Sequence, residues 1–400
     1  MHRRDLQLLV GAIFLSALGD WLALTALALL LEETTDSGLA VAALFIALWA
    51  PLVAFAGLAG LLVDRFDARR VLVAASVVQA VVAAGLAFAD GLAPILALTA
   101  VLGTANAVSQ PAEFALIPAV VSRERIGAAN AHVETARFVG FAAGPLLGGI
   151  LAGAGGTRLA LLVDAVSFLV IALAAAALRE RAGARATAAE GEPVGRARDG
   201  IVFLARDQLL RLVMLVAFAS LLFMTASAPA EVFFAKDVLD VGDAGFGALW
   251  TAWFAGMALG GLMLARRVPG GFLAGAALVA IVIQSLGLAV PTLWLVFPFA
   301  LALYVVGGAA HGTKNVLVRT LMHQRVPTRL HGRAFAAYNG LRNGAEMVAL
   351  MLGGIFVAAI GARWTLFVAG AVPAAAGLAG LAVYRRMRVR DLPVPASEAV

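Results

Sequence analysis

The sequence predicts an all-α membrane protein in which twelve transmembrane helices form two pseudo-symmetric six-helix bundles. The chain of 400 residues is 62% hydrophobic and has a mean hydropathy of +0.95, whereas soluble domains are about 45–50% apolar. Apolar runs of about 20 residues, the length that crosses ~30 Å of hydrocarbon, recur along the whole chain. A polar stretch divides these runs into six and six, and the two halves resemble each other.

The predicted spans follow one another with short connections, and glycine, proline or a charged residue interrupts several of them. They cover residues 6–31, 39–63, 71–89, 92–117, 132–154, 159–178, 209–233, 244–265, 271–290, 293–318, 334–360 and 363–384.

The basic residues are distributed asymmetrically between the connections. Most of the 30 Lys and Arg residues lie at the termini or in alternate loops, and the other loops hold only Arg158, Lys236 and Arg363. By the positive-inside rule, both termini lie in the cytoplasm of a multi-pass protein of the cell inner membrane. The start, Met1–Arg4 before an apolar run, can also be read as a secretory or twin-arginine signal, but the run is too long for a signal core.

Composition also limits the partners. The net charge of +6 follows membrane topology, so we expect no nucleic-acid partner. Cysteine is absent and the five histidines show no metal-ligand spacing, so neither a disulfide nor a metal site is expected. The partners expected are the lipid bilayer, protons and a small-molecule substrate, with no cofactor, no nucleotide and a monomeric chain.

The chain divides into three parts. Residues 1–178 form the N-terminal bundle, 179–208 a cytoplasmic linker that is helical from about Gly200, and 209–400 the C-terminal bundle with a short cytoplasmic tail. A shift of 205 residues aligns Arg137 with Arg342 and a Leu-Gly-Gly-Ile run in each half. Internal repeats of this kind build many secondary transporters. Chance similarity between alanine-rich helices is the alternative.

The connection between spans two and three reads Gly60-Leu-Leu-Val-Asp64-Arg65-Phe-Asp67-Ala68-Arg69-Arg70. It resembles the G-x-L-x-D-R-x-G-R loop of the major facilitator superfamily. The glycine lets two helices approach, the acid can face a helix N-terminus, and the arginines anchor the loop in the cytoplasm. Asp67 and Ala68 depart from the family pattern. The conformational loop predicted here consists of Gly60, Asp64, Arg65, Arg69 and Arg70.

The fifth span holds the run GFAAGPLLGG, which begins at Gly140. Glycine in a helix interior costs up to ~1 kcal/mol and proline ~3 kcal/mol, so the run indicates close helix packing at a kink. It resembles the antiporter motif of the same superfamily, with its fixed residues at Gly140, Gly144, Pro145, Gly148 and Gly149. The resemblance implies drug/proton exchange. Two further stretches, Ser16–Trp21 and Gln110–Glu113, resemble the branch of siderophore exporters and macrolide-efflux proteins. The arginine of many drug antiporters is missing from the fourth span.

Two acidic residues are the predicted proton-coupling groups. Asp20 lies roughly 20 Å into the first span at 1.5 Å per residue, and a carboxylate at the bilayer centre costs ~2.5–3.5 kcal/mol. It is read as a proton carrier, with a structural acid as the alternative. Glu113 is either a proton carrier or the partner of Lys314 or Arg319. Asp164 is read as interfacial.

Two further charge pairs are predicted inside the spans. Glu134 with Arg137, and Arg342 with Glu346, are spaced for contact on one helix face and suit a gate or packing network better than direct coupling.

The substrate cavity is predicted from aromatic and polar residues. Trp294 and Trp364 start outer-side spans and fit an interfacial belt, whereas deeper tryptophans can stack on an apolar substrate, or simply pack in the core. The predicted cavity residues are Ser16, Trp21, Trp49, Trp253 and His311.

Together these features predict a secondary transporter that exports a small amphipathic or lipophilic molecule, such as a drug, macrolide or siderophore-like compound, by proton antiport and alternating access. An uptake symporter or uniporter on the same scaffold is the first alternative. A membrane-embedded sensor or enzyme is the second, although the chain has no HExxH, G-x-S-x-G or phosphate-loop motif. Without a nucleotide motif, the proton gradient is the expected energy source.

Overall fold

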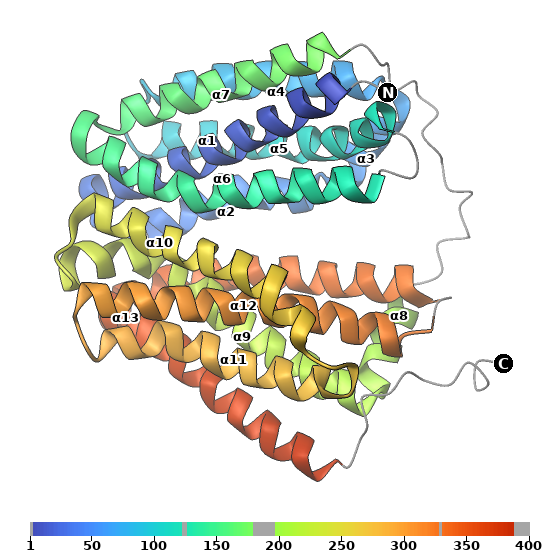
Figure 1. Cartoon of the computed structure of the whole chain (residues 1–400). Coiled ribbons are helices and arrows are strands. Elements are labelled where there is room, and N and C mark those ends of the chain that lie inside the picture. The colour runs from blue at the N-terminus through green and yellow to red at the C-terminus, as the bar shows by residue number, and fades with distance from the viewer. Residues whose placement is uncertain (1–2, 122–125, 179–196, 328–329, 388–400) are drawn as a thin grey trace. The chain divides into compact units, whose positions relative to one another are not determined.

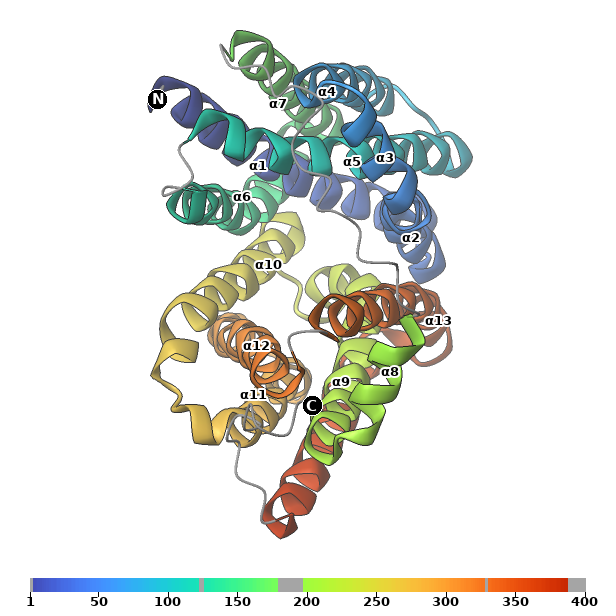
Figure 2. The ribbon, with the colours of Figure 1, turned by 90° about the vertical axis from the view of Figure 1, so that its right-hand side faces the viewer.

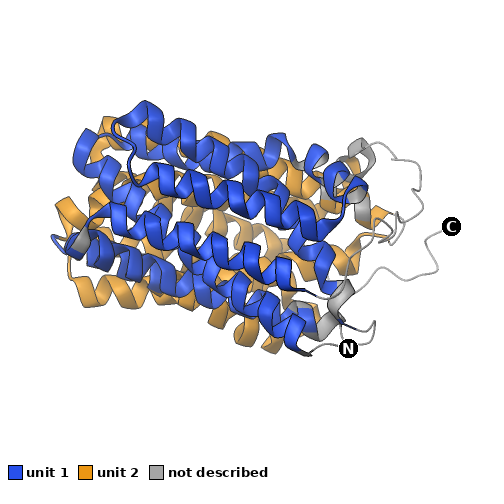
Figure 3. Ribbon diagram, turned by 90° about the horizontal axis from the view of Figure 1, so that it is seen from above, with its two compact units in different colours: residues 1–190, 240–251 blue, residues 191–239, 252–400 orange. Residues whose placement is uncertain are grey.

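The computed structural model of the chain describes residues 3–121, 126–178, 197–327 and 330–387 (Figure 1). Every regular element in these ranges is a helix. The chain divides into two compact units, drawn in two colours in Figure 3: unit 1 takes residues 1–190 and 240–251, and unit 2 takes residues 191–239 and 252–400. Helix α10 is therefore shared, with its first half in unit 1.

The described residues of unit 1 hold seven complete helices. The second predicted span is built from two of them, which meet at the non-helical Phe55. Ser37 accepts a hydrogen bond from the Ala40 N–H and caps the first of this pair. The helices are α1 (Arg3–Thr35), α2 (Gly38–Ala54), α3 (Ala56–Arg65), α4 (Ala68–Leu86), α5 (Leu92–Val120), α6 (Ile126–Gly155) and α7 (Thr157–Ala177), followed by the start of α10 (Gly242–Leu259).

Unit 2 begins with α8 (Ala197–Arg206), which lies beside α9 (Gln208–Phe233) in Figure 2. The predicted linker is thus helical from Ala197, slightly earlier than expected, and its residues 179–196 lie outside the described part. α10 continues through a π-helical turn, Gly260–Leu264, and α11 (Leu273–Ala289), α12 (Phe297–Arg325) and α13 (His331–Arg386) complete the unit.

Each of the twelve predicted spans contains helix, although the second is interrupted at Phe55 and the helix of the tenth begins at Phe297 rather than at residue 293. Nine helices there are long and apolar enough to cross a membrane by length and composition. One of them, α13, counts as two spans because Gly361 has φ 76° and ψ 164°, which breaks the helix. Two predicted spans remain. One is α2 together with α3, and the other is α12, whose glycines, His311 and Lys314 lower its hydropathy.

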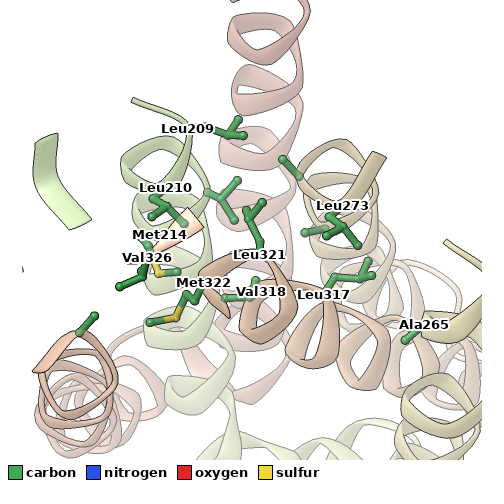
Figure 4. Packing of buried hydrophobic residues seen from close by; sticks show 14 residues of the cluster. Leu209, Leu210, Met214, Ala265, Leu273, Leu317, Val318, Leu321, Met322 and Val326 are labelled. Atoms are coloured by element: carbon green, nitrogen blue, oxygen red, sulfur yellow. The ribbon is translucent and has the colours of Figure 1, made fainter. Parts of the chain in front are cut away.

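Each unit has its own apolar core. Figure 4 shows one cluster of unit 2, in which side chains of α9, α11 and α12 meet. Leu210 and Leu321 in this cluster are completely buried. Because lipid is as apolar as leucine, such clusters hold the helices of a unit together through close van der Waals packing rather than through removal from water.

The repeat predicted from the sequence recurs as hydrogen bonds. In unit 1, Arg158 donates from Nε to the Ala87 carbonyl oxygen at 3.0 Å. In unit 2, Arg363 donates from Nε to the Thr292 carbonyl oxygen at 2.9 Å. Each residue of the second pair lies 205 positions after its counterpart in the first. The glycine two positions before each arginine, Gly156 or Gly361, has a positive φ of 79° or 76°.

Two more contacts follow the same numbering. Gln79 on α4 donates to Asn106 on α5, and Gln284 on α11 contacts His311 on α12, again 205 positions later. These matches make chance similarity untenable, because chance does not place the partners of each residue in register. The halves are a structural repeat.

Candidate functional site

The glycines of the predicted antiporter motif form a stripe on α6, spaced four residues apart, that lies against the backbone of α1. A Cβ added at Gly140 would lie 2.8 Å from the Leu18 nitrogen, and one at Gly144 would lie 2.7 Å from the Leu18 carbonyl oxygen. At Gly148 it would lie 2.5 Å from the Leu22 carbonyl oxygen. The motif therefore allows α1 and α6 to pack backbone against backbone.

The last glycine of the motif faces a different element. A Cβ at Gly149 would lie 2.3 Å from the carbonyl oxygen of Asp243, in the part of α10 that belongs to unit 1. From that segment, Gly247 approaches Pro145 equally closely, and Thr251 accepts a hydrogen bond from the Leu146 N–H at 3.2 Å. Helix α6 runs unbroken through Pro145 from Ile126 to Gly155, so this proline marks a packing site rather than a helix end.

A cavity of about 160 Å³ lies within unit 1 and holds the principal candidate residue. Asp20 of α1 lines it, with Trp21, Trp49 and Phe141 as aromatic walls and Asn106 among its polar groups. Asp20 is partly buried and has no hydrogen-bond partner among the described residues. The cavity thus combines one acid with aromatic surface. Of the predicted cavity residues, Ser16 is buried one turn away on α1 and does not line it.

Aromatic contacts join the cavity wall to a larger cluster in unit 1. Trp21 lies edge-on to Phe141 at 5.7 Å and to Trp250 at 5.2 Å, measured between ring centroids. Trp49 stacks on Phe45 at 5.3 Å. Such pairs contribute ~0.5–1.5 kcal/mol beyond their buried area, which holds the cavity wall in place.

Glu113 of α5 has a different partner from those expected. Arg137 of α6 donates from Nη2 to its Oε2 at 3.0 Å, and both side chains are largely buried. The sequence left Glu113 as a proton carrier or a partner of Lys314 or Arg319, and it placed Glu134 beside Arg137. In the structure Arg137 pairs with Glu113 instead, because helix packing, rather than spacing along one helix, brings the buried pair together. This pair lies within electrostatic range of Asp20.

Asp164 lies deeper than the sequence predicted. The sequence placed it at the membrane interface, but its side chain on α7 is completely buried. A Cβ added at Gly19 of α1 would lie 2.5 Å from its Oδ1 atom. Asp164 therefore lies against the backbone next to Asp20, and the two acids are within electrostatic range of each other.

The predicted conformational loop is mostly helical. Gly60, Asp64 and Arg65 belong to α3, and only two residues separate that helix from α4. The side chain of Asp64 lies outside the described part. The acid that caps a helix is Asp67, whose Oδ1 accepts from the Arg70 N–H at 3.0 Å.

The loop arginines lie at the start of α4 or the end of α3. Arg69 donates to the Ala176 carbonyl oxygen of α7, which ties the loop to another helix of unit 1. Arg65 and Arg70 are exposed, as expected for residues that meet water or lipid headgroups.

Unit 2 holds a separate polar network around His311. Its Nδ1 atom lies 3.1 Å from Gln284 Oε1, and its Nε2 atom lies 2.9 Å from Asn315 Nδ2. Since an amide nitrogen donates and an amide oxygen accepts, both bonds require a neutral imidazole with its proton on Nδ1. Trp253 packs on His311 at 5.8 Å between centroids. Lys314 is also buried beside this histidine.

The second predicted charge pair is present in unit 2. Arg342 donates from Nε to Glu346 Oε1 at 2.9 Å along one face of α13, and both side chains are partly exposed. In the described residues, no group of three or more His, Asp or Glu side chains is placed to hold a metal ion.

These features define a class of protein: a helical membrane transporter built from an internal repeat. The family model for the Major Facilitator Superfamily matches residues 9–350, and the chain belongs to this family. An uncharacterized MFS-type transporter, YfiS of Bacillus subtilis, is 23% identical over 398 residues, covering 94% of this chain and 92% of the relative.

Solved structures share the fold. The nucleoside transporter NupG superposes with a TM-score of 0.76 at 15% identity and covers 96% of this chain and 99% of its own. A bacterial homologue of the human lysosomal transporter Spinster, inward-facing and unoccupied, gives 0.75 at 14% identity, covering 99% and 100%. A bacterial homologue of the iron transporter ferroportin gives 0.68 at 14% identity, covering 95% and 99%.

Sequence reasoning missed Phe141 and Asn106 of the cavity, as well as the capping role of Asp67 and the burial of Asp164. Asp67 carries a detectable signal, since an aspartate directly before a helical run is a standard N-cap. For Asp164 the available signal was the acid itself within an apolar run; its position against Gly19 depends on how α1 and α7 cross.

Proposed function

We propose that this chain exports a small amphipathic or lipophilic molecule, such as a drug, macrolide or siderophore-like compound, by proton antiport and alternating access. The observation that carries the proposal is the placement of Asp20 in a cavity walled by Trp21, Trp49 and Phe141. An acid inside a membrane protein is expensive unless it serves a ligand or an ion pathway. Here the acid and the aromatic surface face the same space.

The size of the cavity bears on the substrate class. Pockets that enclose a whole drug-sized ligand measure ~300–1,000 Å³, whereas this cavity measures about 160 Å³. It fits a compact head group, with the rest of the molecule outside it. An amphipathic substrate has that shape.

Coupling follows from competition for Asp20. A ligand shifts a conformational equilibrium only by its different affinity for the two states. If the proton and the substrate head group both need the Asp20 carboxylate, binding of one displaces the other, and the two bias opposite states. Asp20 protonates from outside and releases its proton inside. Glu113, with Arg137, sets the charge beside it.

The setting is the cell inner membrane, with both termini in the cytoplasm and a monomeric chain. The basic residues in alternate loops support this orientation.

The test uses purified chain in liposomes that contain the pH-sensitive dye pyranine. A macrolide, a catechol siderophore and a lipophilic cation are offered in turn, and proton flux is followed. Asp20→Asn is expected to abolish substrate-driven proton flux, while Glu33→Gln, at an exposed acid, leaves it intact. Unchanged flux in Asp20→Asn would refute the assignment. Flux with the direction of an uptake symporter, in vesicles of known orientation, would favour the alternative.

A further inference from the structure

The acid that the proposed mechanism does not use is Asp164. Asp164 is completely buried in α7. Because Gly19 has no side chain, the Oδ1 atom of Asp164 lies directly against the backbone of α1 there. Its Oδ2 atom is buried and has no hydrogen-bond partner in the described part of the chain. An ionised carboxylate in this position lacks the partners that a buried charge needs.

The hydrogen bonds around Asp164 also indicate a bound proton. The Ser167 hydroxyl oxygen lies 2.8 Å from the Asp164 backbone oxygen and 3.2 Å from Asp164 Oδ1. A serine hydroxyl has one proton to donate, and the shorter distance assigns that proton to the backbone oxygen. A proton on Asp164 Oδ1 lets the acid donate to the serine oxygen across the 3.2 Å contact, which a carboxylate fills only by sharing the serine proton with the backbone oxygen. The network closes when Asp164 is a carboxylic acid.

The charged surroundings agree with this state. α1, α4 and α6 pack against α7. From α1, the ionisable neighbour is Asp20, which repels a second negative charge. The buried polar residues of α4, Ser76 and Gln79, are uncharged.

Three basic residues of these helices are engaged elsewhere. Arg69 and Arg158 lie at helix ends and donate to the backbone oxygens of Ala176 and Ala87. From α6, Arg137 is paired with Glu113, and Glu134, on the same face of α6, adds a further negative charge. No described positive charge is placed to neutralise Asp164.

The second half of the chain shows that the fold does not need this acid. The counterpart of Asp164 in the repeat, 205 positions later, is Ala369, and the counterpart of Asp20, 204 positions later, is Met224. Ala369 is buried, as Asp164 is. The same helix crossing is therefore built with an alanine in unit 2, so an acid kept there in unit 1 has a task other than packing.

We infer that Asp164 is a second proton-carrying group of this transporter, which works together with Asp20 across the contact between α1 and α7. In the described conformation the pair holds a proton on Asp164, as a carboxylic acid that donates to Ser167. When Asp20 becomes neutral, by taking a proton or by pairing with a cationic group, the repulsion falls; in a conformation that opens Asp164 to water, its proton then passes to that water and leaves a carboxylate. The inference rests on the proposed proton coupling and adds one proton site to it.

The test needs no substrate and so fails or succeeds independently of the transport assay. The full chain in liposomes is followed by infrared difference spectroscopy between mildly acidic and mildly alkaline pH, in H₂O and D₂O. A protonated carboxyl group gives a C=O stretching band that shifts in D₂O. The variants are Asp20→Asn, Asp164→Asn and the double variant. Asparagine can still donate to Ser167, so Asp164→Asn is expected to keep the melting temperature.

The expected result is a carboxyl band in Asp20→Asn that is lost as the pH rises and is missing from the double variant. Ser167→Ala, which removes the hydrogen-bond acceptor, should shift the frequency of that band in the Asp20→Asn background. Identical spectra for Asp20→Asn and the double variant would show that Asp164 carries no proton and would overturn the inference. A band that persists at the most alkaline pH would make Asp164 a purely structural acid, with the same consequence. Loss of the band on replacing choline chloride by NaCl would assign the site to Na⁺ instead.

Discussion

The contact between α1 and α6 makes a quantitative prediction about glycine. A Cβ at Gly148 would lie 2.5 Å from the Leu22 carbonyl oxygen, whereas a Cβ at Gly153 on the same helix would lie 3.7 Å from its nearest neighbour, an ordinary contact. Gly148→Ala therefore forces α1 and α6 apart by roughly 1 Å or strains both backbones. Overpacking of this kind costs ~1–3 kcal/mol.

The comparison of the two variants isolates that cost. Alanine is favoured over glycine in a helix by up to ~1 kcal/mol, and both substitutions gain this preference. The difference between them should therefore be the packing cost, ~1–3 kcal/mol. A change of 1 kcal/mol shifts the melting temperature by ~2–4 °C for a unit of 150–250 residues. We expect Gly148→Ala to melt several degrees below Gly153→Ala.

The assay is a thermal melt of both purified variants in one detergent at one scan rate. Intrinsic fluorescence suits this chain, which has 6 Trp, whereas a thiol-reactive dye would find no cysteine. Equal melting temperatures for the two variants would refute the reasoning, because they would mean that α1 and α6 are not in backbone contact at Gly148.

Three further predictions concern single contacts. Glu113→Gln leaves Arg137 buried without its partner, which costs ~3–5 kcal/mol for a fully buried pair. The double variant Glu113→Gln/Arg137→Gln should recover part of the lost melting temperature. Without such recovery, the pair would not be supported. Asp67→Ala removes the cap of α4 at a cost of ~0.5–2 kcal/mol, whereas Asp67→Asn should melt like the wild type. If both variants lost the same melting temperature, the charge of Asp67 and not its capping bond would matter. His311→Asn recreates in unit 2 the Gln–Asn pair of unit 1. It should have a higher melting temperature than His311→Ala, which leaves the buried Gln284 oxygen unpaired at a cost of ~1–3 kcal/mol. A lower melting temperature for His311→Asn would count against the repeat.

Periodicity and composition were sufficient to predict the fold. A run of about 20 apolar residues can satisfy its backbone in lipid only as a helix or in a closed barrel, so the spans follow from length alone. The break at Gly361 within α13 also follows locally, since a glycine between two apolar runs readily takes a positive φ.

The charged contacts could not be predicted in the same way. Spacing along one helix favoured Glu134 for Arg137, but an exposed i,i+3 pair gains only ~0.2–0.5 kcal/mol. Leaving the buried Glu113 without a partner costs far more. The pairing is thus decided by which side chains the packing of α5 and α6 removes from water, and a single sequence does not contain that information.

Comparison of the two halves separates residues that serve the fold from residues that serve a function of one half. Contacts that recur in register, such as Arg158 with Ala87 and Arg363 with Thr292, serve both halves equally and therefore serve the fold. The glycine stripe recurs in part: Gly148 meets Leu22, and Gly353 meets Ala226, each against a carbonyl oxygen.

The acids of unit 1 do not recur. Met224, Val318 and Ala369 stand where Asp20, Glu113 and Asp164 stand in the first half. Val318 and Ala369 are buried, so the second half shows that apolar residues fill those places without loss of the helix packing. Carboxylates are costly inside a membrane, and of these three acids only Glu113 has a basic partner, Arg137, among the described residues. Their confinement to one half therefore favours a role in binding a proton or a substrate, and we expect substitutions of Asp20 and Asp164 to change transport more than stability.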